Sequence, residues 1–394
     1  MKLPMSRHAF YSMTGTFTIL SILGQVSTSI YSPFFYDLAI MYSSHVGVIE
    51  KSVAIFLIAF SISQLLSGFI CDYVNKQSFL LYGLLVFMAG TAMVTLADKE
   101  STFLIGRIIQ GLGGGVGVSV SRGLSRQLFN EKQLNVSLSI TNIAFAIAPA
   151  IAPLVGTLIG GYFGVSAIFY FILMMGLIAL LLLFSVGSTI NQYTSPNSAN
   201  VLSDTLALIK NSIVNIVSVG IASGLLYGIV FCFITIAPSM VMQQFELSKT
   251  MFSIYSLFAT LCFVVGSLTN IRLAAISTIT KFKLSSIFIL GLSLLFCLVT
   301  IGTGDAELIA ILIYCYIAFF FIGIAMPCSV TMILGFSKTS AGFLAALTGF
   351  FHLTGAAAGA YFVTLFTAGP TLSFSVTTMA LSMGSVVICV FIRK

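Results

Sequence analysis

The chain reads FLIGRIIQGLGGGVGV over residues 103–118 and NIAFAIAPAIAPLVGTLIGG over residues 142–161. In water both would form poor helices, because Gly and Pro weaken the interior of a helix. In lipid the backbone must form a helix to satisfy its own polar groups, and small residues let neighbouring helices pack closely. The two stretches therefore predict closely packed membrane helices, provided that the rest of the chain is suited to lipid.

Composition favours lipid as the surroundings of this chain. Of its 394 residues, 58% are hydrophobic and only 7% are charged, whereas soluble proteins carry about 25% charged residues. The mean hydropathy is +1.12. The seven cysteines lie in or beside apolar runs without the paired spacing of metal ligands. We therefore expect no disulfide, no metal site and no cofactor.

Apolar runs long enough to cross a bilayer, about 20 residues each, occur twelve times. The predicted spans are 11–36, 48–70, 78–97, 101–122, 134–162, 166–187, 208–240, 250–271, 284–303, 306–334, 340–367 and 369–391. No small-residue cleavage site follows the first run, so we expect it to remain as a helix. The sequence thus predicts an all-α integral membrane protein with twelve transmembrane helices.

A polar segment divides these spans into six and six. It reads STINQYTSPNSANVLSD over residues 188–204, and its Ser, Asn, Thr and Pro content is typical of a loop. Six plus six is the pattern of two homologous halves related by pseudo-symmetry. We predict an N-terminal six-helix bundle at 1–187, a cytoplasmic linker at 188–207 and a C-terminal six-helix bundle at 208–394.

Lysine and arginine are unevenly distributed between the predicted loops. With a cytoplasmic N-terminus, the outer loops hold Lys51, Lys99 and Lys249, and Arg107 lies inside a span. The inner loops and tails hold the other thirteen: Lys2, Arg7, Lys76, Arg122, Arg126, Lys132, Lys210, Arg272, Lys281, Lys283, Lys338, Arg393 and Lys394. This bias predicts that both termini are cytoplasmic. It also accounts for the net charge of +7 without a nucleic-acid partner.

The motifs that would indicate an enzyme are missing from the sequence. The glycine run at 111–117 superficially resembles a phosphate-binding loop, but no strand precedes it and no Lys-Ser/Thr pair follows it. We interpret it as a packing surface. No Walker A sequence and no hydrolase motif occurs. All ten acidic residues lie at span ends or in loops, whereas a proton-coupled transporter usually carries a carboxylate inside the membrane.

Arg107 is the one charged residue well inside a predicted span, about 9 Å deep at 1.5 Å per residue. Because a buried Arg is costly in lipid, we expect its side chain to face a cavity and contact substrate or a proton-linked polar network. The alternative is a structural role in which it reaches the outer headgroups. Gln25, Tyr31, Gln110 and Asn142 either line the same cavity or form interhelical hydrogen bonds.

Two further ionisable residues are candidates for function. His352 lies midway along the eleventh span and could carry a proton, or it is neutral and bonded to a neighbouring helix. Asp72 ends the second span. It is either solvated beside Lys76, or it binds the positive N-terminus of the eleventh span at Thr339–Ser340. The second arrangement would form a gate between the halves.

Six segments, in order along the chain, carry a family resemblance. They are residues 27–39 (STSIYSPFFYDLA), 68–77, 107–113 (RIIQGLG), 148–156 (APAIAPLVG), Met326–Pro327 and 341–352 (AGFLAALTGFFH). Together they resemble the major facilitator superfamily, specifically the drug:proton antiporters with twelve spans, and most closely the Bcr/CflA branch. The resemblance covers nearly the whole chain, and the double-proline segment is its most specific part.

The resemblance implies two six-helix bundles around a central cavity that opens alternately to either side of the bacterial inner membrane, in a protein that works as a monomer. It implies a gating element that comprises Gly68, Asp72 and Lys76. It also implies an antiporter element in the fifth span that comprises Pro149, Pro153, Gly156 and Gly160.

Three departures from the family pattern bear on proton coupling. Ser29 stands where the branch has an Asp in the first span, and Gln127 replaces an acid after the fourth span. His352 stands where the branch has a Gln. Proton coupling would then depend on His352 or Asp37.

These features predict a secondary transporter, not an enzyme, that exports small amphipathic drugs or metabolites from the bacterial cytoplasm in exchange for protons. Its expected partners are the small-molecule substrate, protons and the lipid bilayer. One alternative is a dedicated exporter of a natural product such as a siderophore. Another is an uptake symporter for a nutrient or metabolite, against which the fifth-span element argues because it accompanies export within the superfamily.

Overall fold

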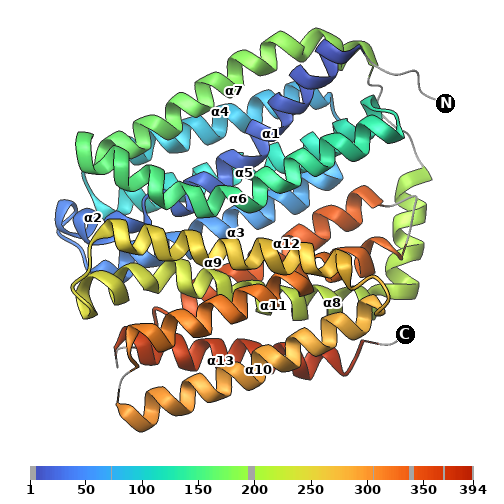
Figure 1. The fold of residues 1–394 in the computed structure, drawn as a ribbon. Coiled ribbons are helices and arrows are strands. Elements are labelled where there is room, and N and C mark those ends of the chain that lie inside the picture. The colour runs from blue at the N-terminus through green and yellow to red at the C-terminus, as the bar shows by residue number, and fades with distance from the viewer. Residues whose placement is uncertain are drawn as a thin grey trace.

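The computed structural model describes residues 6–71, 73–193, 200–304, 306–336, 341–366 and 369–392. Within these ranges the chain is almost entirely helical and forms no β-strand (Figure 1). The helices are α1 (Arg7–Ser29), α2 (Phe35–Met41), α3 (Val46–Ile70), α4 (Lys76–Thr95), α5 (Glu100–Leu128), α6 (Glu131–Phe163), α7 (Val165–Tyr193), α8 (Asn200–Ser239), α9 (Lys249–Arg272), α10 (Thr278–Thr303), α11 (Leu308–Leu334), α12 (Ala341–Phe362) and α13 (Pro370–Cys389).

Ten of these helices are long and apolar enough to cross a membrane, counted over the described residues. A further helix, α6, is bent by 52° between Pro149 and Ile151 and counts as an eleventh span if its two parts are taken together. Proline removes a backbone hydrogen bond and commonly bends a helix. α1 spans 23 residues but is rich in Ser, Thr and Gly and is not among the eleven. Its membrane crossing stays a prediction.

The first predicted span, 11–36, is wrong beyond Ser29. α1 ends at that residue, and a 3₁₀ turn, η1 (Ser32–Phe34), leads into the short helix α2. Pro33 lies within η1 and has no backbone N–H to continue the hydrogen-bond pattern of an α-helix. The polar and proline-containing segment therefore separates α1 from α2.

The predicted linker at 188–207 is helical at both of its ends. α7 continues to Tyr193, and α8 begins at Asn200. The intervening residues, 194–199, lie outside the described ranges. The division of the chain into two bundles, 1–187 and 208–394, stays a prediction in its boundaries.

The helices are arranged in two groups (Figure 1). We call α1–α7 the N-terminal group and α8–α13 the C-terminal group. α3 and α6 of the first group lie against α12 and α9 of the second. Both chain ends are at the same end of the molecule, which we call the termini end, and the opposite end is the far end.

Glycine permits the closest contacts between helices. A Cβ on Gly113 of α5 would lie 2.1 Å from the backbone nitrogen of Phe87 in α4. A Cβ on Gly355 of α12 would lie 2.0 Å from the carbonyl oxygen of Gly224 in α8. Real Cβ atoms essentially never come within 3.0 Å of such atoms, so these crossings require glycine. The packing role predicted for the glycine run is confirmed.

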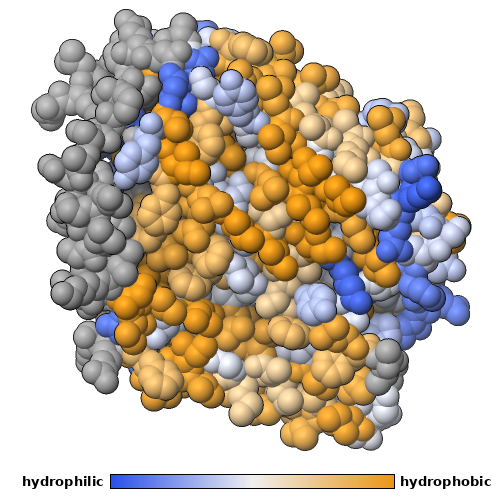
Figure 2. Space-filling model, turned by 180° about the vertical axis from the view of Figure 1, so that it is seen from behind, coloured by the Kyte–Doolittle hydropathy of each residue, from blue (hydrophilic) through white to orange (hydrophobic). Residues whose placement is uncertain are grey.

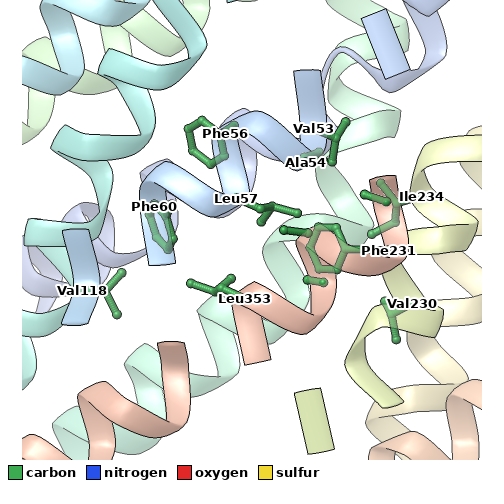
Figure 3. Packing of buried hydrophobic residues seen from close by; sticks show 14 of the residues in the cluster. Val53, Ala54, Phe56, Leu57, Phe60, Val118, Val230, Phe231, Ile234 and Leu353 are labelled. Atoms are coloured by element: carbon green, nitrogen blue, oxygen red, sulfur yellow. The ribbon is translucent and has the colours of Figure 1, made fainter. Parts of the chain in front are cut away.

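Apolar side chains fill the contact between the groups and cover the outside of the molecule. Leu57 of α3 lies toward Phe231 of α8 and Leu353 of α12, and all three are buried (Figure 3). Figure 2 shows a broad apolar face, with hydrophilic residues gathered at the far end. An apolar belt with polar residues at its edge is the surface that a bilayer requires.

Candidate functional site

A cavity of about 530 Å³ lies between the two helix groups. Its walls come from α3, α5 and α6 on one side and from α8, α9, α11 and α12 on the other. It extends toward the termini end, where Arg126, Leu334 and Ala345 contribute from the ends of their helices. A space of this size is typical of sites for small molecules.

Most of the cavity wall is apolar. Phe145 of α6, Phe231 of α8, Phe263 of α9 and Phe319 of α11 contribute aromatic rings from four helices, and Met326 adds a flexible thioether. Rings and a thioether adapt to apolar ligands of different shapes. The wall therefore suits the apolar part of a ligand.

The polar side chains of the wall include two arginines. Arg122 and Arg126 lie one helical turn apart on α5. The guanidinium carbon of Arg122 lies 5.7 Å from the ring centroid of Phe145. Among the described lining residues there is no Asp or Glu. The described wall therefore carries positive charge where α5 approaches the termini end.

His352 of α12 connects three helices at the cavity wall. Its Nε2 lies 3.2 Å from the hydroxyl oxygen of Ser329 in α11 and 3.2 Å from that of Ser223 in α8. The ring of Tyr227 lies 5.8 Å away, centroid to centroid. His352 thus both lines the cavity and bonds to neighbouring helices, while its role as a proton carrier stays a prediction.

Of the polar residues expected to line a cavity, Asn142 does so from α6. Gln25, Tyr31, Arg107 and Gln110 do not belong to the described lining of this cavity. They are buried within the N-terminal group, and each is at most 1% exposed. Asn142 thus lies where the cavity alternative places it, and the other four lie outside the described lining. A role of these five residues in binding stays a prediction.

Arg107 is part of a buried polar network. Its Nη1 donates to Oε1 of Gln110, and Nε2 of Gln110 donates to Oγ1 of Thr91 in α4 at 2.9 Å. Its guanidinium carbon lies 4.7 Å from the ring centroid of Tyr31 and 4.2 Å from that of Phe56. Cation–π contacts of this kind are attractive, more so when desolvated. The network ties α3, α4 and α5 to the segment after α1. Arg107 is fully buried in it and so does not reach the outer headgroups, while its role in function stays a prediction.

Polar contacts of charged side chains join the helix groups at the far end. Nζ of Lys249, at the start of α9, lies 2.7 Å from the carboxylate of Asp37 on α2. The hydroxyl of Ser239, the last residue of α8, donates to Oε1 of Glu50 on α3 at 2.5 Å. Glu50 is 5% exposed. An ion pair and a buried hydrogen bond therefore contribute to holding the far end closed.

The two prolines of α6 face the C-terminal group. Pro149 lines the cavity. The carbonyl oxygen of Pro153 accepts a hydrogen bond from the hydroxyl of Ser253 in α9 at 3.2 Å. The same hydroxyl lies 2.8 Å from that of Thr157. The double-proline segment thus runs from the cavity wall to the closed contact with α9.

The two glycines of the predicted antiporter element face the other way, into the N-terminal group. A Cβ on Gly156 would lie 1.8 Å from the carbonyl oxygen of Ile30. A Cβ on Gly160 would lie 2.4 Å from Cζ of Phe34. These glycines let α6 approach the backbone that follows α1.

The predicted gating element can be located only in part. A Cβ on Gly68 would lie 2.5 Å from the Cβ of Ala346 in α12, so α3 and α12 cross closely there. Lys76 begins α4 and is 3% exposed. Asp72, Thr339 and Ser340 lie outside the described residues. The gate involving Asp72 therefore stays a prediction.

Three residues of this arrangement were not singled out from the sequence. Arg122 and Arg126 were assigned to an inner loop, and Glu50 to a span end. α5 continues to Leu128, and Leu124 and Leu128 are buried. Leucines four residues apart, offset by two from the arginines, are the amphipathic signal that identifies this extension.

Comparisons with known proteins give the same fold and a family. The model of the Major Facilitator Superfamily matches residues 17–360. "Multidrug resistance protein D" of Escherichia coli (strain K12) is 29% identical over 125 residues, which are 32% of each chain. "Bicyclomycin resistance protein homolog" of Haemophilus influenzae is 25% identical over 171 residues, 43% of each chain. The matched stretches thus span less than half the length of these relatives.

A solved structure extends the likeness in fold to the whole chain. The crystal structure of the human organic anion transporter MFSD10 (TETRAN) has a TM-score of 0.67 with this chain, at 14% identity. The match covers 98% of this chain and 99% of that one. With a family model that matches most of its length, this multi-pass membrane protein belongs to the Major Facilitator Superfamily.

Proposed function

We propose that this transporter exports small amphipathic molecules, drugs or metabolites, from the bacterial cytoplasm by alternating access in exchange for protons. It would act as a monomer in the inner membrane with both termini in the cytoplasm. One observation carries the proposal: the cavity extends toward the termini end, while polar contacts join the helix groups at the far end. This is the arrangement of a state that is ready to take substrate from the cytoplasm.

Export would require the far end to open. The helix groups would then move as the two predicted domains, 1–187 and 208–394, and the contacts of Lys249 with Asp37 and of Ser239 with Glu50 would break. Polar contacts suit an interface that opens and closes, because water can hydrogen-bond to each group once the contact is broken. The names of the two drug-resistance relatives support export as the direction.

Proton coupling is the finer part of the proposal. His352 is its first candidate, since it lines the cavity and an imidazole can bind and release a proton. Asp37 is the second, because protonation would remove its charge from the pair with Lys249. In either case a proton would bind from one side of the membrane and leave to the other.

The test is transport in inverted membrane vesicles, with and without an imposed pH gradient. We expect the full chain to accumulate amphipathic compounds only when the vesicle interior is acidic. His352→Gln or Asp37→Asn should remove the dependence on the gradient. His45→Gln is the matched control, because His45 is exposed at the start of α3 with no side-chain capping bond.

The same vesicles separate the alternatives. Accumulation of one compound from a broad panel would indicate the dedicated exporter. Loss of preloaded compound when protons leave the vesicle with it would indicate the uptake symporter and contradict export. Transport that ignores the gradient would contradict proton coupling alone.

A further inference from the structure

We infer that the cavity takes small amphipathic organic anions, whose carboxylate, sulfonate or phosphate group binds Arg122. The inference rests on the proposed function, in which this cavity is the transport site. The fold and the apolar wall alone do not determine the charge of a substrate. This inference therefore adds a substrate class to the proposed function.

The first observation is the placement of Arg122 itself. It lines the cavity of about 530 Å³ and also a smaller adjoining one of about 50 Å³. The residue is half-buried, and its guanidinium carbon lies 5.7 Å from the ring centroid of Phe145. Among the described residues no ion pair to Arg122 is found. The guanidinium is thus held over an aromatic face with its hydrogen-bond donors available to a ligand.

The second observation is the charge of the surroundings. Arg126, one helical turn further along α5, lines the same two cavities. The described lining includes no carboxylate. A charge in an apolar space is costly unless a counter-charge accompanies it. An anionic ligand would supply that counter-charge to Arg122, whereas a cationic ligand would be repelled by its guanidinium.

The chemistry of guanidinium narrows the anion. Arginine presents a planar set of N–H donors that matches a carboxylate or phosphate in a two-point contact, and it is weakly hydrated compared with an ammonium. Such a contact holds an oxyanion better than a halide or a neutral polar group. The head group of the substrate is therefore an oxyanion.

The apolar wall determines the rest of the molecule. Phe231, Phe263 and Phe319 lie in the part of the wall that the C-terminal group provides. Arg122 and Phe145 lie in the part that the N-terminal group provides. A ligand with a charged head at Arg122 and an apolar body on the opposite wall would contact both groups. A single molecule could thus bias how the two groups move.

The test compares matched ligands of opposite charge. The purified full chain in a neutral detergent is titrated with 4-phenylbutyrate and 4-phenylbutylammonium, with 1-naphthoate and 1-naphthylmethylammonium, and with 9-anthracenecarboxylate and 9-anthracenylmethylammonium. Equilibrium dialysis gives the dissociation constants. We expect the dissociation constant of each anion to be lower than that of its cationic partner by a factor of about ten or more. Equal binding, or tighter binding of the cations, overturns the inference without any variant.

Variants then assign the contact. Arg122→Gln should weaken anion binding about tenfold or more, and Arg122→Lys should retain part of it, because it keeps the charge but loses the two-point geometry. Arg272→Gln, at the exposed end of α9, is the control and should bind as the wild type does. Anion binding unchanged in Arg122→Gln overturns the assignment. A melting curve of each variant shows whether it is folded.

Transport of the same pairs into inverted vesicles separates this inference from the proposed function. Export of the cations without the anions would contradict the anion class and leave export standing. Tight anion binding without transport of either class would support the site and contradict export.

Discussion

Lys249 at the start of α9 and Asp37 on α2 form an ion pair at 2.7 Å that joins the two helix groups at the far end. The Lys249 ammonium also lies 4.1 Å from the ring centroid of Phe34. Both charged side chains are about one third exposed. A pair of this kind contributes about 0.5–1 kcal/mol, enough to bias an equilibrium between closed and open forms without fixing it.

Asp37→Asn should therefore raise the ratio of molecules with an open far end to molecules with a closed one by about two- to fivefold. His45 and Met251 are exposed near this contact and can carry spin labels on a cysteine-free background. Double electron–electron resonance would then report the shift as a longer distance between the two labels. Exchanging the charges, Asp37→Lys with Lys249→Asp, should restore the distance. Glu307→Gln, at an exposed acid just before α11, is the control. An unchanged distance in Asp37→Asn would show that the pair does not close this end.

Substitution by alanine should destabilise the protein at one glycine of α6 and leave its stability unchanged at another. Gly156→Ala places a Cβ 1.8 Å from the carbonyl oxygen of Ile30, whereas a Cβ at Gly161 meets nothing within 4 Å. We expect Gly156→Ala to lose about 1–3 kcal/mol of stability and Gly161→Ala to lose none. Gly156→Leu should still insert but abolish transport.

The chain carries its own probe for this comparison. All seven cysteines are free and six of them are buried, so a thiol-reactive dye reports unfolding as the temperature rises. Equal melting midpoints for the two alanine variants, or full transport by Gly156→Leu, would contradict the close contact of α6 with Ile30.

Helix positions were predictable because the length of an apolar run is set by the bilayer. The predicted span 250–271 corresponds to α9 (Lys249–Arg272), and 306–334 corresponds to α11 (Leu308–Leu334). The first span was predicted too long, since Pro33 interrupts a run that is otherwise apolar. Hydropathy alone does not register the loss of one backbone N–H.

The site was less predictable than the fold. His352 and Asn142 do line the cavity, but Arg107 is buried beside it in a network of its own. A charge inside a span indicates a polar environment, and that environment can be a cavity or a set of neighbouring side chains. Arg122 was overlooked for the converse reason. Its charge suggested a loop, although the helix continues with one basic and one apolar face.

Arg107→Ala distinguishes a structural role from direct contact with substrate. Loss of the guanidinium leaves Gln110 without its donor and removes the packing on Tyr31 and Phe56. We expect a loss of about 2–4 kcal/mol in stability, seen as a lower melting midpoint. Arg122→Ala is the matched comparison, since it lines the cavity and should weaken ligand binding at nearly unchanged stability. A wild-type melting midpoint with abolished binding in Arg107→Ala would contradict the structural role.

Glu50 and Ser239 can be tested as a pair. Ser239→Ala leaves a buried carboxylate without its hydroxyl partner, which should cost about 1–3 kcal/mol. Glu50→Gln keeps the shape and a hydrogen-bonding oxygen, so its cost should be smaller. A double-mutant cycle on melting free energies should give a coupling of about 1 kcal/mol or more. Strictly additive effects would indicate that the 2.5 Å contact does not stabilise the closed far end.

The glycine crossing of α8 and α12 also bears on how such a chain can evolve. At Gly355 any other amino acid would place an atom 2.0 Å from the backbone of Gly224, and at Gly359 one 2.1 Å from Gly228. Val330 and Thr348, by contrast, line the cavity, so a larger side chain at either position would extend into it. Mutations that survive will therefore accumulate on the cavity wall. Descendants of this chain can acquire new substrates while inheriting the same axis of helix packing.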